Sequence, residues 1–260
     1  MDATISRHDV PLLEYDPSPR GVIDAAGFDY GEPISHRCVL AFFGDRITDL
    51  AARGELVRVA EIGTEMGPLP IYLMERQGQQ VTVMQPGVGA ALVAGVLEEL
   101  CGRGCDRFVV CGGCGVLDRQ VAAGHLLVPT HALRDEGTSY HYLPAARWVQ
   151  PTARAFEAVC SELDARGLSY LRCKTWTTDA FYRETPAKVA LRRESDGCIA
   201  VEMEAAALFS VARFRGVELA QILYAGDDVS GQEWDSRLWN NRHDLREALI
   251  YLAADAVLRL

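Results

Sequence analysis

Lysine is nearly absent from this chain. Only Lys174 and Lys188 are lysines among 26 basic residues, against 36 acidic ones, so the formal charge is −10 and the pI is near 5.1. Such an acidic chain is a poor partner for a nucleic-acid backbone or an anionic membrane. No apolar run reaches the roughly 18 residues of a membrane span. A small-molecule ligand is therefore expected, with no nucleic acid and no membrane as partner.

Metal-ligand spacing is also missing. The six histidines are scattered, and the pair Cys111 and Cys114 has neither a second cysteine pair nor a nearby histidine to complete a tetrahedral set. We therefore predict no metal and no cofactor. The eight cysteines lie mostly in apolar runs without a preceding secretory signal pattern, so we expect reduced, buried thiols and a cytoplasmic protein.

The remaining composition, 49% hydrophobic and 24% charged over 260 residues, is that of a globular chain with a sizeable core. Residues 1–36 hold four prolines and no sustained periodicity, which predicts an extended N-terminal arm lying over the domain or onto a neighbouring subunit. Residues 37–260 are predicted to form a single domain, because no linker or repeat interrupts them. Short β-branched runs alternate there with helical patterns, as is typical of an α/β sheet covered by helices.

The expected elements follow from this alternation. Strands are predicted at residues 38–43, 56–61, 71–75, 80–85, 108–111, 125–133, 170–176, 199–201 and 220–224. Helices are predicted at residues 90–101, 151–166, 186–193 and 238–258. Gly102 provides the expected stop for the first helix, and Thr185 before Pro186 provides a cap and a first residue for the third.

Glycines follow three of these strands. Gly44 comes after the first, Gly87 and Gly89 come after the fourth, and residues 112–115 follow the fifth as Gly-Gly-Cys-Gly. Glycine lets the backbone approach a ligand closely, and loops after neighbouring strands meet at one edge of a sheet. The three segments predict one shared crevice, although each alone is equally typical of a tight turn required by packing.

Glu202 and Glu204 interrupt an otherwise apolar junction between a strand and a helix. A buried carboxylate is costly without a partner. A vicinal diol, whose two hydroxyls can both donate to one carboxylate, would be the functional partner. An arginine such as Arg213 or Arg215 would be the structural one, and the sequence favours neither.

Asp227 and Asp228 end the last predicted strand. An aspartic acid at the mouth of a partly apolar cleft can donate a proton to a leaving group. Such a pair is equally typical of a turn or a helix cap, so both interpretations stay open.

Taken together, these segments resemble the nucleoside phosphorylase superfamily, which includes uridine phosphorylases, hexameric purine nucleoside phosphorylases and thioadenosine-type nucleosidases. The resemblance runs from about Val39 to Leu258. The motifs that carry it, in the order of the family, are Gly-Gly-Cys-Gly at 112–115, Ala-Gly-His-Leu-Leu-Val-Pro at 123–129, Thr-Asp-Ala-Phe-Tyr at 178–182, Val-Glu-Met-Glu at 201–204 and Gly-Asp at 226–227.

The resemblance implies a three-layer αβα sandwich around a mixed, partly barrel-like sheet, in a homo-oligomer of two, three or six subunits. It also implies roles for particular residues. Phe181, with Tyr182 beside it, corresponds to the aromatic side chain that stacks on the base, and Cys114 and Gly115 line the base pocket. Met203 lies under the sugar, Glu204 binds the ribose hydroxyls with Glu202 beside it, and Asp227 protonates a purine at N7.

The nucleophile site departs from the family. Phosphorolytic members carry an arginine in a Gly-Asp-Pro-x-Arg pattern, where this chain has Gly44-Asp45-Arg46-Ile47-Thr48 and so places Thr48 at the arginine position. Val110 replaces a second arginine, and Gly113 replaces a hydroxyl residue. Family members take a third phosphate ligand from a neighbouring subunit, and Arg58 is a poor candidate for it. Arg46, Arg134 or Arg183 could compensate, but none is in register. Gly44, Arg46 and Gly113 are thus expected at a site for phosphate or water.

The sequence therefore leaves three hypotheses. The first is phosphorolysis of a nucleoside, with phosphate as co-substrate and with a purine favoured over uracil, because Thr185 and Ala187 stand where uracil-binding residues are expected. The second is a hydrolytic nucleosidase in which Asp45 activates water. The third is a nucleoside-binding protein without catalysis.

Overall fold

The computed structural model describes residues 5–31 and 34–260. The strands are β1 (Arg37–Ala41), β2 (Val57–Ile62), β3 (Leu69–Arg76), β4 (Gln79–Met84), β5 (Arg107–Val116), β6 (Leu126–Asp135), β7 (Trp148–Val149), β8 (Tyr170–Thr178), β9 (Cys198–Glu202) and β10 (Glu218–Asp228). The α-helices are α1 (Gly44–Ala52), α2 (Ala90–Gly102), α3 (Ala153–Ala165), α4 (Pro186–Glu194), α5 (Ala205–Arg215) and α6 (His243–Val257). Each predicted strand and helix overlaps one of these elements.

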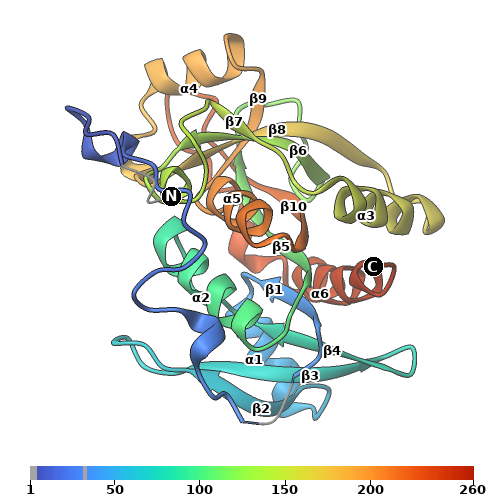
Figure 1. Ribbon diagram of the computed structural model, residues 1–260. Helices are drawn as coiled ribbons and strands as arrows, with labels where there is room; N and C mark the ends of the chain where they lie inside the picture. Colours follow the sequence, from blue (N-terminus) through green and yellow to red (C-terminus); the bar gives the residue numbers. More distant parts are fainter. Residues whose placement is uncertain (1–4, 32–33) are drawn as a thin grey trace.

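The strands form one mixed sheet in the order β10-β6-β8-β9-β5-β1-β4-β3-β2, with β7 beside β6. Because β10 also pairs with β5, the strands β10, β6, β8, β9 and β5 close into a barrel (Figure 1). The strands β1 to β4 extend from this barrel as an open sheet. The predicted α/β fold around a partly barrel-like sheet is confirmed.

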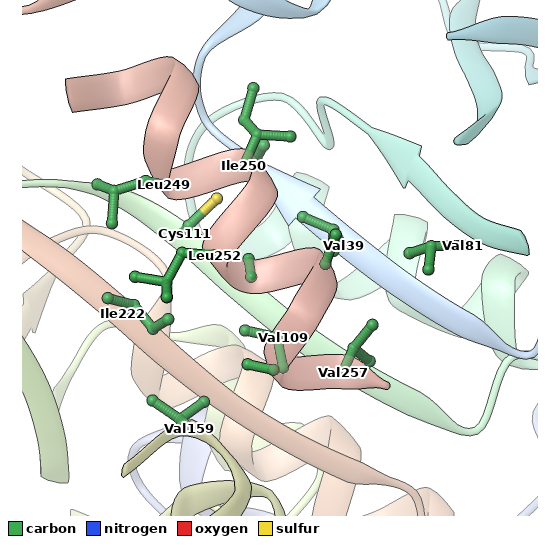
Figure 2. Close-up of a cluster of buried hydrophobic side chains, with 14 of the residues drawn as sticks. Val39, Val81, Val109, Cys111, Val159, Ile222, Leu249, Ile250, Leu252 and Val257 are labelled. Atoms are coloured by element: carbon green, nitrogen blue, oxygen red, sulfur yellow. The ribbon is translucent and has the colours of Figure 1, made fainter. Parts of the chain in front are cut away.

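Helices cover both faces of the sheet. Helices α1, α3 and α6 pack on one apolar cluster, and α2 and α5 pack on another across the sheet. Figure 2 shows Leu249, Ile250 and Val257 of α6 over Val39 of β1 and Val109 of β5. The central strands are apolar on both faces, as expected for parallel strands between helical layers. Within the described residues, no helix is both long and apolar enough to cross a membrane.

The glycine segment 112–115 is strand, where the sequence predicted a loop. Strand β5 continues to Val116 because β10 pairs with it along one edge and β9 pairs with its end. Glycine is needed for close packing in this strand. A Cβ on Gly113 would lie 3.1 Å from the Tyr224 ring, and one on Gly115 would lie 2.9 Å from a methyl group of Val201.

Two further predictions need correction. The C-terminal helix was expected from residue 238 but begins at His243, because Leu238 has a left-handed backbone with φ of +49° and a short 3₁₀ turn, η5 (Trp239–Asn241), follows it. Gly44 was expected in a loop but is the first residue of α1. Strand β7 was not predicted, because two residues are too short to show a periodicity.

The N-terminal segment packs along the surface, with its second half against α2 and its first half against the 3₁₀ turn η3 (Thr138–His141). It contains two 3₁₀ turns, η1 (Pro11–Leu13) and η2 (Ala25–Gly27), and the second packs on the end of α2. The guanidinium of Arg103 lies 4.3 Å from the centre of the Tyr30 ring, and Arg215 donates a hydrogen bond of 2.6 Å to the carbonyl of Pro19. Residues 1–4 and 32–33 of the predicted arm lie outside the described residues.

Candidate active site

One cavity of about 740 Å³ opens at the carboxyl ends of β5, β9 and β10, beside the start of α5. Such an edge is where the glycine pattern predicted a shared crevice. Nine of the twelve predicted site residues line it: Gly113, Cys114, Gly115, Phe181, Tyr182, Glu202, Met203, Glu204 and Asp227. They come from four separate parts of the chain, which the closure of the barrel brings together.

Glu202 is a structural carboxylate. It accepts hydrogen bonds from the Thr177 hydroxyl at 2.6 Å and the Thr175 hydroxyl at 3.3 Å. Its other oxygen accepts from the backbone N–H groups of Glu204 at 2.7 Å and Ala205 at 2.6 Å, where α5 begins. Neither a diol nor an arginine is needed as its partner, because four donors already stabilise it.

Glu204 has fewer partners. Its carboxylate accepts hydrogen bonds from the backbone N–H groups of Gly89 at 2.8 Å and Met203 at 3.2 Å. Burial and the charge of Glu202 raise its pKa to about 8. Arg215, suggested as a partner, instead pairs with Glu98 at 2.7 Å. Among the described residues no arginine pairs with Glu204, so this carboxyl has hydrogen-bonding capacity left for a ligand.

The two adjacent aspartates have different roles. Asp228 forms a turn, accepting from the Ser230 N–H at 2.8 Å, and pairs with Arg237 at 2.6 Å. Asp227 lines the cavity, and its Oδ2 accepts a 2.6 Å hydrogen bond from the indole N–H of Trp234. The turn interpretation therefore applies to Asp228, and Asp227 is the one that faces the ligand space.

Sequence reasoning missed Glu184. It lies between the 3₁₀ turn η4 (Phe181–Arg183) and α4, and it lines the same cavity. Burial, together with the negative charge of Asp227, raises its pKa to about 7. In the sequence it precedes the Thr185-Pro186 helix start and is indistinguishable from an ordinary acidic residue near a helix N-terminus. Only the tertiary fold turns it toward Asp227.

The cavity is acidic. Five carboxyl groups line it, and none of its lining residues in the described chain is lysine, arginine or histidine. These carboxyl groups belong to Glu184, Glu202, Glu204, Asp227 and Glu233. Most of the remaining lining is apolar or glycine. The described lining itself therefore offers no cationic side chain to an anionic ligand.

The predicted nucleophile residues at the start of α1 are not in this lining. Gly44, Asp45 and Arg46 form the first turn of α1, and Asp45 pairs with Arg46 at 3.0 Å and with Arg246 at 3.1 Å. Burial opposes ionisation of Asp45, but the hydrogen bond from Arg46 and the charge of Arg246 outweigh it and lower the pKa. Asp45 is thus an ion-paired carboxylate outside the cavity, which does not fit a base that activates water there.

The other arginines weighed as phosphate ligands are also elsewhere. Arg134 is buried and donates to the carbonyls of Ser139, Leu143 and Pro144, where it holds a loop together. Arg58 pairs with Glu61 on the exposed edge strand β2. Neither lines the cavity.

Cys114 lies in the cavity wall as predicted. It is buried, and its thiol donates to the carbonyl of Tyr224 at 3.4 Å. Cys111, three residues earlier, belongs to a different apolar cluster, so the two thiols do not face one another. All eight cysteines are free.

The chain is an α/β protein whose barrel-closed sheet lies between helical layers, with an acid-lined cavity of small-molecule size at its strand ends. The model of a family described as the phosphorylase superfamily matches residues 36–258, and the chain belongs to this superfamily. Membership of this superfamily makes the chain an enzyme.

Individual relatives are distant. A guanosine phosphorylase of Halorubrum lacusprofundi is 29% identical over 83% of this chain and 89% of the relative. A DeoD-type purine nucleoside phosphorylase of Bacillus cereus is 28% identical over 70% of this chain and 77% of the relative. The crystal structure of an AMP nucleosidase from Bacteroides thetaiotaomicron has the same fold, with a TM-score of 0.69 and 23% identity over 86% of this chain and 88% of that one.

Proposed function

We propose that this enzyme cleaves the N-glycosidic bond of a purine nucleoside. The observation that carries the proposal is the convergence of Glu204, at the start of α5, and Asp227, near the end of β10, on one cavity. The two carboxyl groups belong to two separate elements that follow one another in the chain. Because both carboxyl groups line the same cavity, they support a site that binds a nucleoside by its sugar and by its base.

The chemistry explains why two acids are needed. Cleavage of an N-glycosidic bond builds positive charge on the sugar and negative charge on the departing base. Asp227 protonates the base as it leaves, and Glu204 accepts hydrogen bonds from the ribose hydroxyls. Met203 lies beneath the sugar, and Phe181 stacks beside the base. The further carboxyl groups of the lining favour the cationic sugar in the transition state.

A purine is the favoured base. Thr185 and Ala187 replace the residues that would bind uracil, and a proton donor such as Asp227 matches the N7 atom of a purine. The names of the Halorubrum and Bacillus relatives support this choice.

Phosphate is the nucleophile that the family resemblance favours. Among the described residues of one subunit, the cavity lining holds no basic side chain for it, and a buried dianion without a cation is strongly disfavoured. Phosphorolysis therefore requires cations from a second copy of the chain, which agrees with the homo-oligomer that the resemblance implies.

Hydrolysis is the second candidate, and the acidic lining favours it. Water is neutral and enters such a cavity without the cost that phosphate meets. In this route Asp45 has no direct part, because it is ion-paired outside the cavity.

Product analysis separates the two routes. The purified protein is incubated with guanosine, inosine, adenosine and uridine, with and without phosphate. Ribose 1-phosphate formed only with phosphate identifies phosphorolysis, and free ribose formed without it identifies hydrolysis. Binding of nucleosides without release of base under either condition would leave the third hypothesis, a nucleoside-binding protein.

Replacing the predicted acid tests the mechanism directly. Because a positioned general acid contributes roughly 100-fold or more to rate, Asp227→Asn should lower kcat at least about 100-fold while nucleoside binding persists. Glu233→Gln is the matched control, since Glu233 also lines the cavity but is solvent-exposed. Equal turnover by Asp227→Asn and wild type would exclude Asp227 as the acid.

A further inference from the structure

A second pocket, of about 400 Å³, lies apart from the acidic cavity. It is formed by the carboxyl end of β6, the turn η3, the segment before β7 and one side chain of α4. Strands β6 and β7 and helix α4 lie together at one end of the molecule (Figure 1). Among the described residues, none lines both spaces, so this pocket is separate from the proposed nucleoside site. Its lining includes three arginines, Arg134, Arg147 and Arg192.

Arg134 is a buried cation without a carboxylate partner. Only 5% of the residue is exposed. Its guanidinium donates to the Ser139 hydroxyl and to the carbonyls of Ser139, Leu143 and Pro144, and all of these acceptors are uncharged. Among the described residues it forms no ion pair, and burial lowers the pKa of Arg134 more than the charge of Glu136 raises it. The four hydrogen bonds use four of its five N–H groups, so one Nη1 N–H and an unpaired positive charge are left for an anion.

The other two arginines of the pocket share their acids. Arg147 donates three hydrogen bonds to Asp196, at 2.7, 2.8 and 2.9 Å. Arg192 donates to the same carboxylate at 3.2 Å and to Asp135 at 2.9 Å. The ammonium of Lys188 also lies 3.5 Å from Asp135. The Nε of Arg192 is buried and has no hydrogen-bond partner among the described residues, so these acids do not satisfy the cations around them.

Positive charge is therefore in excess around this pocket, although the whole chain carries a net charge of −10. Lys174 donates from its ammonium to the carbonyl of Asp196, so both lysines of the chain lie in this region. The five basic side chains are Arg134, Arg147, Lys174, Lys188 and Arg192, and the acids that pair with them or act on them are Asp135, Glu136 and Asp196. Such a local surplus attracts an anion.

We infer that this pocket binds the phosphate group of a small phosphate monoester. The surplus of positive charge favours a phosphate dianion over a singly charged carboxylate, and the planar guanidinium groups of arginine match pairs of phosphate oxygens. The pocket also has room for the organic part of the ester, because about 400 Å³ is many times the ~30 Å³ share of a water molecule. Leu13 and Leu133 give this part an apolar surface. The bound phosphate supplies the anion that Arg134 lacks.

Two substitutions at exposed positions of the lining test the assignment. Ala146→Glu adds a carboxylate and Arg147→Gln removes a cation, and the fold should persist because both residues are solvent-exposed. Each should weaken binding of glycerol 3-phosphate at least about tenfold, the loss expected for one charge-assisted hydrogen bond. Arg53→Gln is the matched control. Arg53 is also partly exposed and donates to both oxygens of Glu247, but it lies outside the pocket, so its removal should leave the affinity unchanged.

Titration calorimetry at pH 8, where the ester is a dianion, provides the readout at constant ionic strength. The wild type should bind one glycerol 3-phosphate per chain, and should bind acetate and inorganic phosphate more weakly, acetate by at least about tenfold. Glu204→Gln, which changes the other cavity, should bind the ester as the wild type does. The inference is overturned by a wild type that does not bind the ester, by equal affinity for acetate or for inorganic phosphate, or by unchanged affinity in Ala146→Glu. Loss of binding in Glu204→Gln would assign the ester to the acidic cavity and would also overturn it.

Discussion

The number of hydrogen-bond donors around Glu202 and Glu204 distinguishes a structural carboxylate from one that can bind a ligand. The two side chains are equally buried, each about 6% exposed, and they are two residues apart. Glu202 accepts from two hydroxyls and two N–H groups, which oppose the rise in its pKa that burial causes. Glu204 accepts from two N–H groups and lies beside the negative charge of Glu202. Glu202 therefore stabilises the start of α5, whereas Glu204 has hydrogen-bonding capacity left for a ligand.

The raised pKa of Glu204 predicts a pH-dependent preference for ribose. Below its pKa of about 8 the free carboxyl group is protonated, and above it the carboxylate can accept from both the 2′ and the 3′ hydroxyl. The ratio of affinities for guanosine over 2′-deoxyguanosine should therefore increase from pH 6 to about pH 8 and stay constant above. Because both ligands share one base, any titration of Glu184 cancels from this ratio.

Titration calorimetry over this pH range measures the ratio. Below pH 8, guanosine should also release more protons than its deoxy analogue, visible as a dependence of the binding enthalpy on the buffer. The control is Glu204→Gln, which should give a ratio near one at every pH. A pH-independent ratio in the wild type would show that Glu204 does not bind the diol.

Sequence analysis located most of the cavity because its residues lie in strongly patterned segments. Glu204 and Asp227 each interrupt or end an apolar run, which makes them visible without coordinates. Glu184 stands among polar residues and gives no such signal. The ion pair of Asp45 could not be predicted for a related reason. The sequence shows Gly44 and Asp45 after a strand but not Arg246, which pairs with Asp45 from a helix about two hundred residues away.

At the level of elements, the end of α2 decides where the N-terminal segment lies. Gly102 is the last residue of this helix, and a Cβ there would lie 2.6 Å from the carbonyl oxygen of Ala25 in η2. A backbone atom cannot move aside as a flexible side chain can. Gly102→Ala should therefore displace the arm from α2.

Limited proteolysis of the first 36 residues measures this displacement, and cleavage of Gly102→Ala should be faster than that of the wild type. Gly95 provides a matched control in the same helix, because a Cβ there would contact nothing within 4 Å. Gly95→Ala should keep the arm in place and stabilise the protein by roughly 0.5–1 kcal/mol, the gain from removing a helical glycine. Identical cleavage rates for the two variants would contradict the packing argument.

The elements that the sequence predicted correctly have local sequence signals, such as helix stops, that match the element observed in the fold. Helix α2 ends at Gly102, as its sequence predicts. The glycine segment of β5 was predicted as a loop, because three glycines in four residues are a typical loop signal. What keeps this segment extended is the pairing with β10, which comes from more than one hundred residues further along the chain.

For the whole molecule, Asp255 connects three elements that are distant in sequence. This carboxylate lies on α6, is almost fully buried, and accepts from Arg76 at 2.7 and 2.8 Å and from Gln77 at 2.9 Å. Arg166, the residue that follows α3, forms an ion pair with the same carboxylate. The helical layer is thereby tied to the outer hairpin of β3 and β4.

Removing this charge leaves Arg76 without its carboxylate and Arg166 with Glu162 alone, so Asp255→Asn should lower the free energy of unfolding by about 3 kcal/mol. Burial raises the pKa of Asp255, but the hydrogen bonds from Arg76 and Gln77 and the charges of Arg76 and Arg166 lower it overall below the usual 3.8. The stabilisation is therefore present above pH 4 and is lost as the pH falls through the folded pKa.

Urea denaturation at pH 7 and pH 3 measures both effects. The difference between wild type and Asp255→Asn should be largest at pH 7 and should narrow at pH 3. Asp244→Asn, an exposed change in the first turn of the same helix, should alter stability by well under 1 kcal/mol. A difference that is the same at both pH values would exclude ionisation of Asp255 as its source.

The five carboxyl groups of the cavity also bear on the charge of the ligands that can bind there. A nucleotide differs from its nucleoside by a phosphate dianion on the 5′ oxygen, and the described lining contains no basic side chain to receive it. Within one subunit a neutral nucleoside therefore meets no charge repulsion in this space, whereas its phosphate ester does. Unless a second subunit supplies cations, as phosphorolysis would require, we expect the enzyme to prefer a nucleoside to its 5′-phosphate ester and so to draw on the pool that a phosphatase releases.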